Sequence, residues 1–224
     1  MVLLAHGVWE SRLNLVRRAR FLHEAGFGVL LIDLQAHGES RGDRITFGAR
    51  ESRGIVAAAA FARTHHPGER IGIIGISLGG ASVTLAPDAR LDAVVLESVY
   101  PTIDQALVNR LRENLAPAAA PTVPLLAPVF KLLMPWVIGV SPATLRPIDA
   151  IANLHAPVLI LAGSKDTRTP LPEARALFDA AHQPKQFYTV EGAAHEDLER
   201  YDPTAYWPVI VPFLTQTLRA PEDP

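Results

Sequence analysis

Cysteine is absent from this chain of 224 residues. Its absence excludes a disulfide framework, a thiolate metal site and a cysteine nucleophile, so any covalent catalysis must use another side chain. An excess of either charge is also lacking, because 21 basic residues face 23 acidic ones and the formal net charge is −2. Such a balance gives no field that would concentrate a phosphate backbone, so nucleic acid is not an expected partner.

Long uninterrupted hydrophobic runs are lacking as well. The apolar run at residues 1–5 is too short for the hydrophobic part of a signal peptide. The most apolar region, residues 121–140, approaches the length of a membrane span, but three internal prolines and Lys131 interrupt it. The sequence therefore predicts a cytoplasmic protein without an integral membrane segment.

The apolar content is sufficient for one globular core, since 49% of the residues are hydrophobic and 20% are charged. Short β-type runs alternate with helical patterns, which predicts an α/β fold with a mostly parallel sheet of about six strands flanked by helices. Most of these runs are continuously apolar, as expected for strands covered on both faces. The predicted strands are residues 2–5, 28–33, 70–76, 93–97, 158–162 and 186–190, and the predicted helices are residues 11–25, 49–64, 78–85, 172–181 and 206–218.

Seven prolines from Pro117 to Pro147 divide an apolar, helix-forming sequence into short pieces. Long connections in α/β domains are commonly active-site lids. We therefore predict a core of residues 1–100 and 148–224 with a helical cap inserted at residues 101–147. In the alternative interpretation these helices only cover one end of the sheet, with their apolar side chains packed inward. The side chains expected to line an apolar substrate pocket are Trp9, Phe130, Met134 and Trp136.

A G-x-S-x-G motif at residues 75–79 follows one predicted strand and precedes a helix-compatible segment. In this context the motif places Ser77 at the apex of a sharp turn with strained backbone. The residues two positions away on either side must lack a Cβ that would collide with the adjoining strand and helix, and Gly75 and Gly79 meet that requirement. Ser77 is therefore the predicted nucleophile. The alternative is a glycine-rich turn with an incidental serine.

A serine hydroxyl needs a base within hydrogen-bond reach and a third group that orients the base. Of the eight histidines, only His195 follows the last predicted strand in a loop of small residues. His6 and His37 each precede a glycine in a turn, and the others lie in or beside predicted helices or in a connection before a proline. His195 is the predicted base, and the alternative is a surface-loop histidine.

The orienting carboxylate is expected between the serine and the histidine in chain order. Asp166 fits this order, because it follows the predicted strand at residues 158–162. Two rivals are Glu97, at the end of the preceding strand, and Asp197, which is too close in sequence to His195 to approach its ring easily from behind. Asp166 is the predicted acid.

Five short segments together resemble the α/β-hydrolase superfamily, and within it the esterase and serine-peptidase-like members with a small helical cap. The resemblance spans nearly the whole chain and is weakest over residues 101–147. The segments are LAHG at 4–7, DLQAHGES at 33–40, GISLGG at 75–80, GSKD at 163–166 and GAAH at 192–195.

The chain departs from this family at its start, because members normally carry two strands before the one that here includes residues 2–5. Either the sequence is shortened, or it is a minimal version of the fold that lacks the first two strands. In a minimal version the second predicted strand would lie at an open sheet edge. An open edge can pair with another chain, so we expect association into a homo-oligomer through it.

The resemblance implies that Ser77, Asp166 and His195 are nucleophile, acid and base of a catalytic triad. It implies a serine hydrolase, most similar to carboxylesterases, whose partner is a small-molecule ester with a small to medium apolar acyl group. Hydrolysis would proceed through an acyl-enzyme intermediate. No cofactor is implied, and no spacing typical of metal ligands occurs in the sequence.

The resemblance also implies an oxyanion hole made by backbone N–H groups. One belongs to Leu78 and the other to the loop after His6, where Val8 is the expected donor and Trp9 is next in line. His6 is expected to order this loop, and residues 33–40 to shape the domain without touching substrate.

Two other functions stay open beside an esterase. An amidase or exopeptidase would use the same triad and would capture a free peptide terminus with charged groups, for which Glu97, Arg112 and Glu113 are available. A hydrolase-like scaffold used only for binding is the non-enzymatic alternative. The presence of serine, aspartate and histidine in the expected order argues against it.

Overall fold

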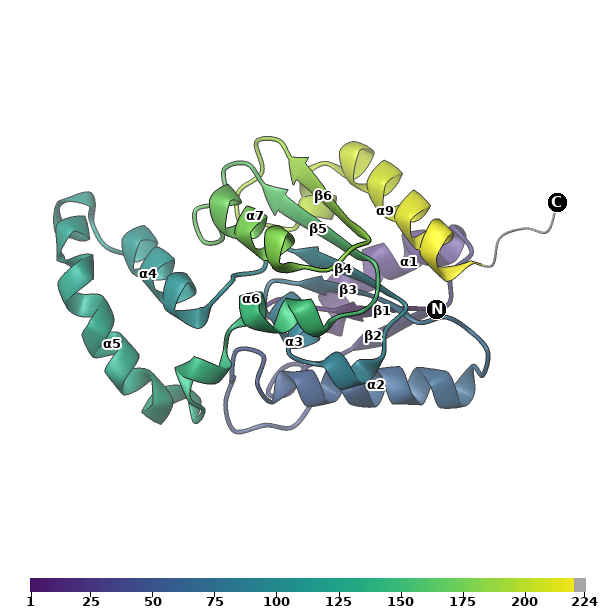
Figure 1. Ribbon diagram of the computed structural model, residues 1–224, viewed down its shortest axis with the longest axis horizontal. Helices are drawn as coiled ribbons and strands as arrows, with labels where there is room; N and C mark the ends of the chain where they lie inside the picture. The colour runs from purple at the N-terminus through teal and green to yellow at the C-terminus, as the bar shows by residue number, and fades with distance from the viewer. Residues whose placement is uncertain (220–224) are drawn as a thin grey trace.

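A six-stranded parallel sheet lies at the centre of the computed structural model, which describes residues 1–219 apart from the side chain of Pro117. The strands are β1 (Val2–Ala5), β2 (Val29–Ile32), β3 (Gly72–Ile76), β4 (Ala93–Glu97), β5 (Val158–Gly163) and β6 (Lys185–Val190). Their order is β2-β1-β3-β4-β5-β6, and every neighbouring pair is parallel (Figure 1). The predicted α/β fold with a six-stranded parallel sheet is confirmed.

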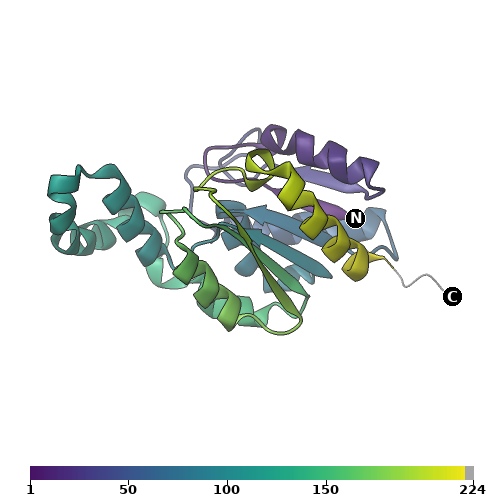
Figure 2. The same cartoon turned by 90° about the horizontal axis from the view of Figure 1, so that it is seen from above.

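Helices cover both faces of this sheet (Figures 1 and 2). The longer helices are α1 (Val16–Glu24), α2 (Glu51–His65), α3 (Leu78–Thr84), α4 (Ile103–Asn114), α5 (Val123–Ile138), α7 (Leu171–Ala180) and α9 (Pro203–Leu218). The short ones are η1 (Arg12–Leu15), η2 (Pro87–Ala89), η3 (Pro117–Thr122), η4 (Pro142–Thr144), α6 (Pro147–Ala150), η5 (Ile151–Asn153) and α8 (Leu198–Tyr201).

Two apolar clusters form the core, one on each face of the sheet. Successive side chains of a strand point to opposite faces. Leu3 and Ile73 therefore pack with α2, α3 and α7, while Leu4 and Ile74 pack with α1 and α9. Because both faces are covered, the inner strands need apolar residues at every position, which explains the continuous runs in the sequence.

The first two strands of the chain lie at one side of the sheet, and β2 is its edge. All four residues of β2 are only partly buried, whereas the neighbouring β1 is fully buried. The expected position of the second strand at an open edge is therefore observed. Association of two chains through that edge stays a prediction.

Residues 101–147 form an arm that projects beyond one end of the sheet, with α4 and α5 as its main helices (Figures 1 and 2). The expectation that prolines divide this region into short pieces is wrong for α5, which continues for 16 residues through Pro128 and Pro135. Each proline removes one backbone hydrogen bond and leaves the others in place. The helix ends at Gly139, whose φ of +74° is typical of a left-handed cap.

Most of the large apolar side chains of α5 face outward. Leu125, Leu132 and Trp136 are 77%, 73% and 83% exposed. They neither pack inward nor line a pocket, because α5 contacts α4 along one narrow side. Lys131 of α5 forms an ion pair with Asp104 of α4.

The stretch Ala118–Ile138 is the one candidate membrane span found within residues 1–219, judged by length and composition alone. Its mean hydropathy is 1.5, and only 11% of it is buried. The chain passes through it between β4 and β5, which pair in register within one sheet. A single membrane crossing there would put two paired strands on opposite sides of the bilayer, so the folded sheet is incompatible with one.

Replacement of Ile73 by alanine tests the core, since its side chain is fully buried in an inner strand. We expect Ile73→Ala to lower the free energy of unfolding by about 2–5 kcal/mol. Leu132→Ala, on the exposed side of α5, is the matched control and should change it by less than about 0.5 kcal/mol. Urea unfolding midpoints measure both, and equal effects would contradict the burial described above.

Candidate active site

Ser77 occupies the turn between β3 and α3 with a φ of +48°, a conformation that residues with a side chain rarely adopt. Its N–H donates to the carbonyl oxygen of Glu97 on the adjacent strand at 2.8 Å. The turn depends on glycine. A Cβ at Gly75 would lie 2.8 Å from backbone atoms of Gly80, and one at Gly79 would collide with the carbonyl of Ala5.

The carboxyl ends of parallel strands lie at the same edge of a sheet, and three of the predicted residues follow β3, β5 and β6 there. The structure brings these residues together. Ser77 Oγ lies 3.2 Å from Nε2 of His195, and Nδ1 of His195 lies 2.8 Å from Oδ2 of Asp166. These are the distances that a nucleophile, a base and an orienting carboxylate require of one another.

Asp166 is 4% exposed and held in place by its own loop. Its carboxylate accepts hydrogen bonds from the backbone N–H groups of Arg168 and Thr169, each at 2.8 Å, and from the Thr169 hydroxyl at 2.6 Å. Burial raises the pKa of Asp166, but the hydrogen bonds from His195 and Thr169 outweigh it and leave the pKa below its ordinary value. The carboxylate is therefore ionised wherever His195 acts as a base.

The loops that carry Asp166 and His195 are joined directly by hydrogen bonds. Lys165 N–H donates to the carbonyl of Ala193 at 2.9 Å, and Gly192 N–H donates to the Ser164 hydroxyl at 2.8 Å. A Cβ at Gly163 would collide with the Ala193 carbonyl, so glycine permits this close approach. These contacts fix the distance between Asp166 and His195 through the backbone.

Of the two expected oxyanion-hole donors, Leu78 directly follows Ser77, and Val8 lines the same cavities as Ser77. Leu78 begins α3, where a backbone N–H has no acceptor within the helix. Val8 lies in the loop that His6 orders. The His6 ring accepts a hydrogen bond from Leu34 N–H at 3.1 Å through Nε2, and its Nδ1 donates to the Gly7 carbonyl at 2.7 Å. Burial lowers the pKa of His6, which favours this neutral, singly protonated form.

Two cavities meet at Ser77 and His195. The larger has a volume of about 250 Å³ and is mainly apolar. Of the pocket residues expected from the sequence, Trp9 and Met134 line it. Phe130 and Trp136 do not, since they lie on the outer side of α5. Sequence reasoning missed Phe47, Tyr100, Ile103 and Leu107, which come from loops and from α4 and carry no motif.

The second cavity is smaller, about 150 Å³, and polar side chains line much of it.

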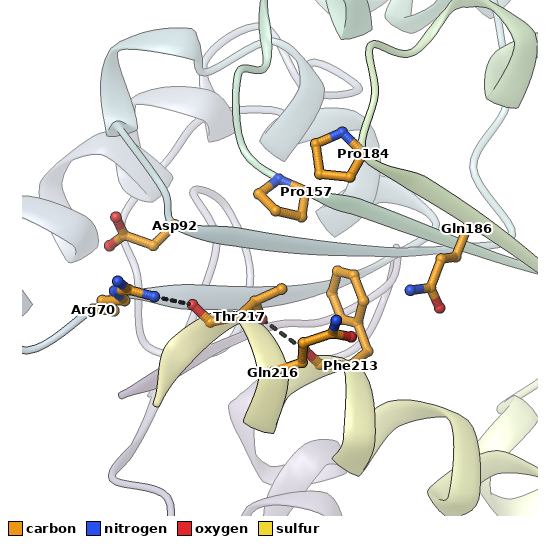
Figure 3. Close-up of a pocket in the computed structure, with 8 residues that line it drawn as sticks. All are labelled: Arg70, Asp92, Pro157, Pro184, Gln186, Phe213, Gln216 and Thr217. Atoms are coloured by element: carbon orange, nitrogen blue, oxygen red, sulfur yellow. Dashed lines mark hydrogen bonds between the residues drawn. The ribbon is translucent and has the colours of Figure 1, made fainter. Parts of the chain in front are cut away.

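Neither of the two contains a metal site, because no group of three or more His, Asp or Glu side chains within residues 1–219 is arranged to hold an ion. Another hollow, of about 490 Å³, lies away from both (Figure 3). It is lined by residues such as Arg70 and Asp92, which precede strands and so mark the opposite edge of the sheet.

The two rival carboxylates, Glu97 and Asp197, contact a buried arginine instead of His195. Arg18 is 1% exposed and donates to Glu97 Oε1 at 2.6 Å, to Tyr206 Oη at 2.8 Å and to Asp197. Burial raises the pKa of Glu97 although Arg18 lies beside it. The sequence could have indicated this network. Arg18 is a charged residue on the otherwise apolar face that Leu15, Leu22 and their neighbours form over η1 and α1.

Arg18 joins β4, the strand next to Ser77, to the loop after His195. Its replacement should therefore strongly destabilise the fold. Arg18→Met leaves Glu97 as an uncompensated buried charge, and we expect it to lower the free energy of unfolding by about 3–5 kcal/mol. Arg20→Met, at an exposed position of the same helix, should change it by less than about 0.5 kcal/mol. Denaturant unfolding monitored by circular dichroism measures the difference, and a mild effect of Arg18→Met would argue against the network.

Sequence comparison finds relatives along most of the chain. The uncharacterized protein YqkD of Bacillus subtilis is 26% identical over 200 residues, which are 87% of this chain and 64% of that protein. An uncharacterized protein of Mycobacterium tuberculosis is 31% identical over 223 residues, covering 96% of this chain and 70% of its own length. The chain therefore spans a little under two thirds of the length of the first of these relatives.

Solved structures share the fold. The Pyrococcus furiosus esterase Pf2001 superposes with a TM-score of 0.79 at 21% identity, covering 97% of this chain and 82% of its own. The Paleococcus ferrophilus monoacylglycerol lipase gives 0.69 at 26% identity, covering 96% and 94%. The model of the alpha/beta hydrolase family matches residues 2–206. With the strand order and the serine turn described above, this match shows that the chain belongs to the α/β-hydrolase family.

Proposed function

We propose that this protein is a serine hydrolase that cleaves small-molecule carboxylic esters through an acyl-enzyme intermediate. The observation that carries the proposal is the continuous chain of hydrogen-bond distances from Ser77 Oγ to His195 Nε2, 3.2 Å, and from His195 Nδ1 to Asp166, 2.8 Å. Membership of a hydrolase family and the likeness to solved esterase and lipase structures support the same reaction class.

In the first half of the reaction, Ser77 Oγ attacks the ester carbonyl carbon while its proton passes to His195 Nε2. Asp166 orients the ring and stabilises the imidazolium that forms. The negative charge on the carbonyl oxygen is placed near the backbone N–H groups of Leu78 and Val8. Such donors act mainly on the tetrahedral intermediate, where one of them contributes about 3 kcal/mol.

When the intermediate collapses, His195 returns the proton to the leaving alkoxide and the acyl group stays on Ser77. A water molecule then replaces the alcohol. His195 takes a proton from the water, the resulting oxygen attacks the acyl carbon, and Ser77 leaves with the proton as a free hydroxyl. The net reaction converts one ester and one water molecule into an acid and an alcohol.

The acyl group is assigned to the apolar cavity, whose volume of about 250 Å³ suits a small to medium chain. Ile103 and Leu107 of α4 and Met134 of α5 form its outer wall. The arm of residues 101–147 would thus act as the cap over bound substrate. An apolar acyl group transferred there from water gains free energy in proportion to its buried surface.

Capture of a peptide terminus by the charged groups considered from the sequence has little support. Glu97 is buried against Arg18, and Glu113 accepts hydrogen bonds from Arg168 and Arg110. Neither of these two glutamates is therefore available to bind a free peptide terminus. A protein that only binds a ligand would not need Ser77, His195 and Asp166 at hydrogen-bond distances from one another.

An active-site serine probe tests the proposal directly. We expect a fluorophosphonate to label the protein at Ser77, and the Ser77→Ala variant to remain unlabelled because the attacking oxygen is gone. Ser82→Ala is the matched control, since the Ser82 hydroxyl is buried and donates to the carbonyl of Leu78. Intact-protein mass spectrometry reads the adduct. Labelling that persists in Ser77→Ala, or no labelling of the parent protein, would contradict the proposal.

The role of Asp166 is tested by Asp166→Asn. The amide keeps the shape but favours the wrong tautomer of His195, and we expect kcat for p-nitrophenyl butyrate to fall by about 10⁴. Asp202→Asn, at the exposed start of α9, should leave kcat within a factor of two of the parent. An Asp166→Asn enzyme with nearly full activity would remove Asp166 from the triad and favour one of the rival carboxylates.

A further inference from the structure

The smaller of the two cavities at Ser77 has a distinct chemistry from its apolar neighbour. It shares Val8, Ser77, Arg168 and His195 with the larger one, and apart from Gly7, Leu15 and Ile76 its remaining lining side chains are polar. They come from the loop after β1, from the ends of β3 and β4, and from the loop after β6. The polar side chains found only in this cavity are Glu10, Asn14, Ser98, Glu196 and Asp197.

Negative charge dominates this cavity. Asp197 is paired with the buried Arg18, and the guanidinium of Arg168 is engaged by Glu113 at 2.7 Å. Glu10 and Glu196, in contrast, have no cationic side chain within 4.0 Å among residues 1–219. After the paired charges are set aside, two carboxylates remain uncompensated.

Each of these two carboxylates is fixed by the backbone through one oxygen. Glu10 Oε2 accepts from Gly7 N–H at 2.8 Å, and Glu196 Oε1 accepts from Ala194 N–H at 3.0 Å. Gly7 lies on the oxyanion-hole loop and Ala194 precedes the catalytic histidine. Backbone hydrogen bonds therefore hold both charges next to the segments that carry Val8 and His195.

Ser98 adds an independent observation. Its side chain lines the cavity and the residue is 2% exposed, yet its Oγ has no hydrogen-bond partner within the described part of the chain. A buried hydroxyl without a partner is unfavourable unless a bound group completes it. Its place after β4 puts this unsatisfied group beside Ser77, which points to a polar ligand at that position.

Building on the proposed ester hydrolysis, we propose that this cavity is the leaving-group subsite and that it selects alcohols carrying a positively charged ammonium group. The apolar acyl chain occupies the larger cavity, so the alcohol must lie on the other side of the ester carbonyl. There His195 can return its proton to the alkoxide oxygen. The uncompensated carboxylates of Glu10 and Glu196 attract a cation on that alcohol, and the Ser98 hydroxyl hydrogen-bonds its ester oxygen.

The experiment compares two hexanoate esters that differ only in the charge of the alcohol. These are the ester of choline and the ester of its neutral carbon isostere, 3,3-dimethylbutanol. We expect kcat/KM to be about tenfold higher for the choline ester, which corresponds to about 1.4 kcal/mol. The preference should shrink as salt is raised, because added ions screen the carboxylates.

Variants of the two carboxylates test which groups produce the preference. We expect Glu196→Gln and Glu10→Gln each to reduce the choline-to-isostere ratio severalfold, since glutamine keeps the backbone contact and removes the charge. Glu191→Gln, in the same loop as Glu196 but outside the cavity, is the matched control and should retain the parent ratio. Two different variants keep the test valid if one of them fails to fold.

Several outcomes would overturn the inference. These are equal kcat/KM for the two esters, a ratio unaffected by both charge-removing variants, or a preference for 1-hexanoylglycerol over both, which would assign the cavity to neutral polyols. Each leaves the proposed function intact as long as p-nitrophenyl hexanoate is hydrolysed and Ser77→Ala is inactive. Failure to hydrolyse any ester would overturn the proposed function as well.

Discussion

Ser77 has a φ of +48°, and the glycines near it in the chain leave the space that this turn needs. Gly75 approaches Gly80, and Gly79 approaches the end of β1, more closely than a Cβ would permit. This packing points the hydroxyl out of the sheet edge while the Ser77 N–H stays bonded to Glu97. Backbone strain of this kind persists only where the surroundings over-determine it. His195, Asp166 and both cavities lie around this turn.

The parallel sheet supplies the rest of the geometry, since it delivers loops from remote parts of the chain to one edge. Asp166 and His195 follow neighbouring strands, and backbone hydrogen bonds between their loops set their separation. Beneath them, Arg18 ties the end of β4 to the segment after His195. The site is thus supported by a buried charge network on one face of the sheet, while the arm of α4 and α5 bounds the apolar cavity from outside.

Much of this could be predicted from the sequence because the signals are local. Most of the six strands are continuous apolar runs, and the predicted limits of all six differ from the observed ones by at most two residues. The order of serine, aspartate and histidine, each after a strand, also predicted which three side chains the structure brings together. Tertiary contacts decide what sequence reasoning missed. The unbroken α5 depends on the hydrogen bonds that remain around its prolines. The outward orientation of Trp136 depends on which side of α5 meets α4, and the role of Arg18 depends on carboxylates from other elements.

The most direct test of the central claim is a crystal structure of the protein after reaction with an alkyl phosphonate. The account predicts a covalent bond from phosphorus to Ser77 Oγ, with the phosphoryl oxygen within hydrogen-bond distance of the backbone nitrogens of Leu78 and Val8. The alkyl chain should occupy the apolar cavity beside Met134. An adduct on another residue, or a phosphoryl oxygen turned away from both nitrogens with His195 displaced from Ser77, would contradict it.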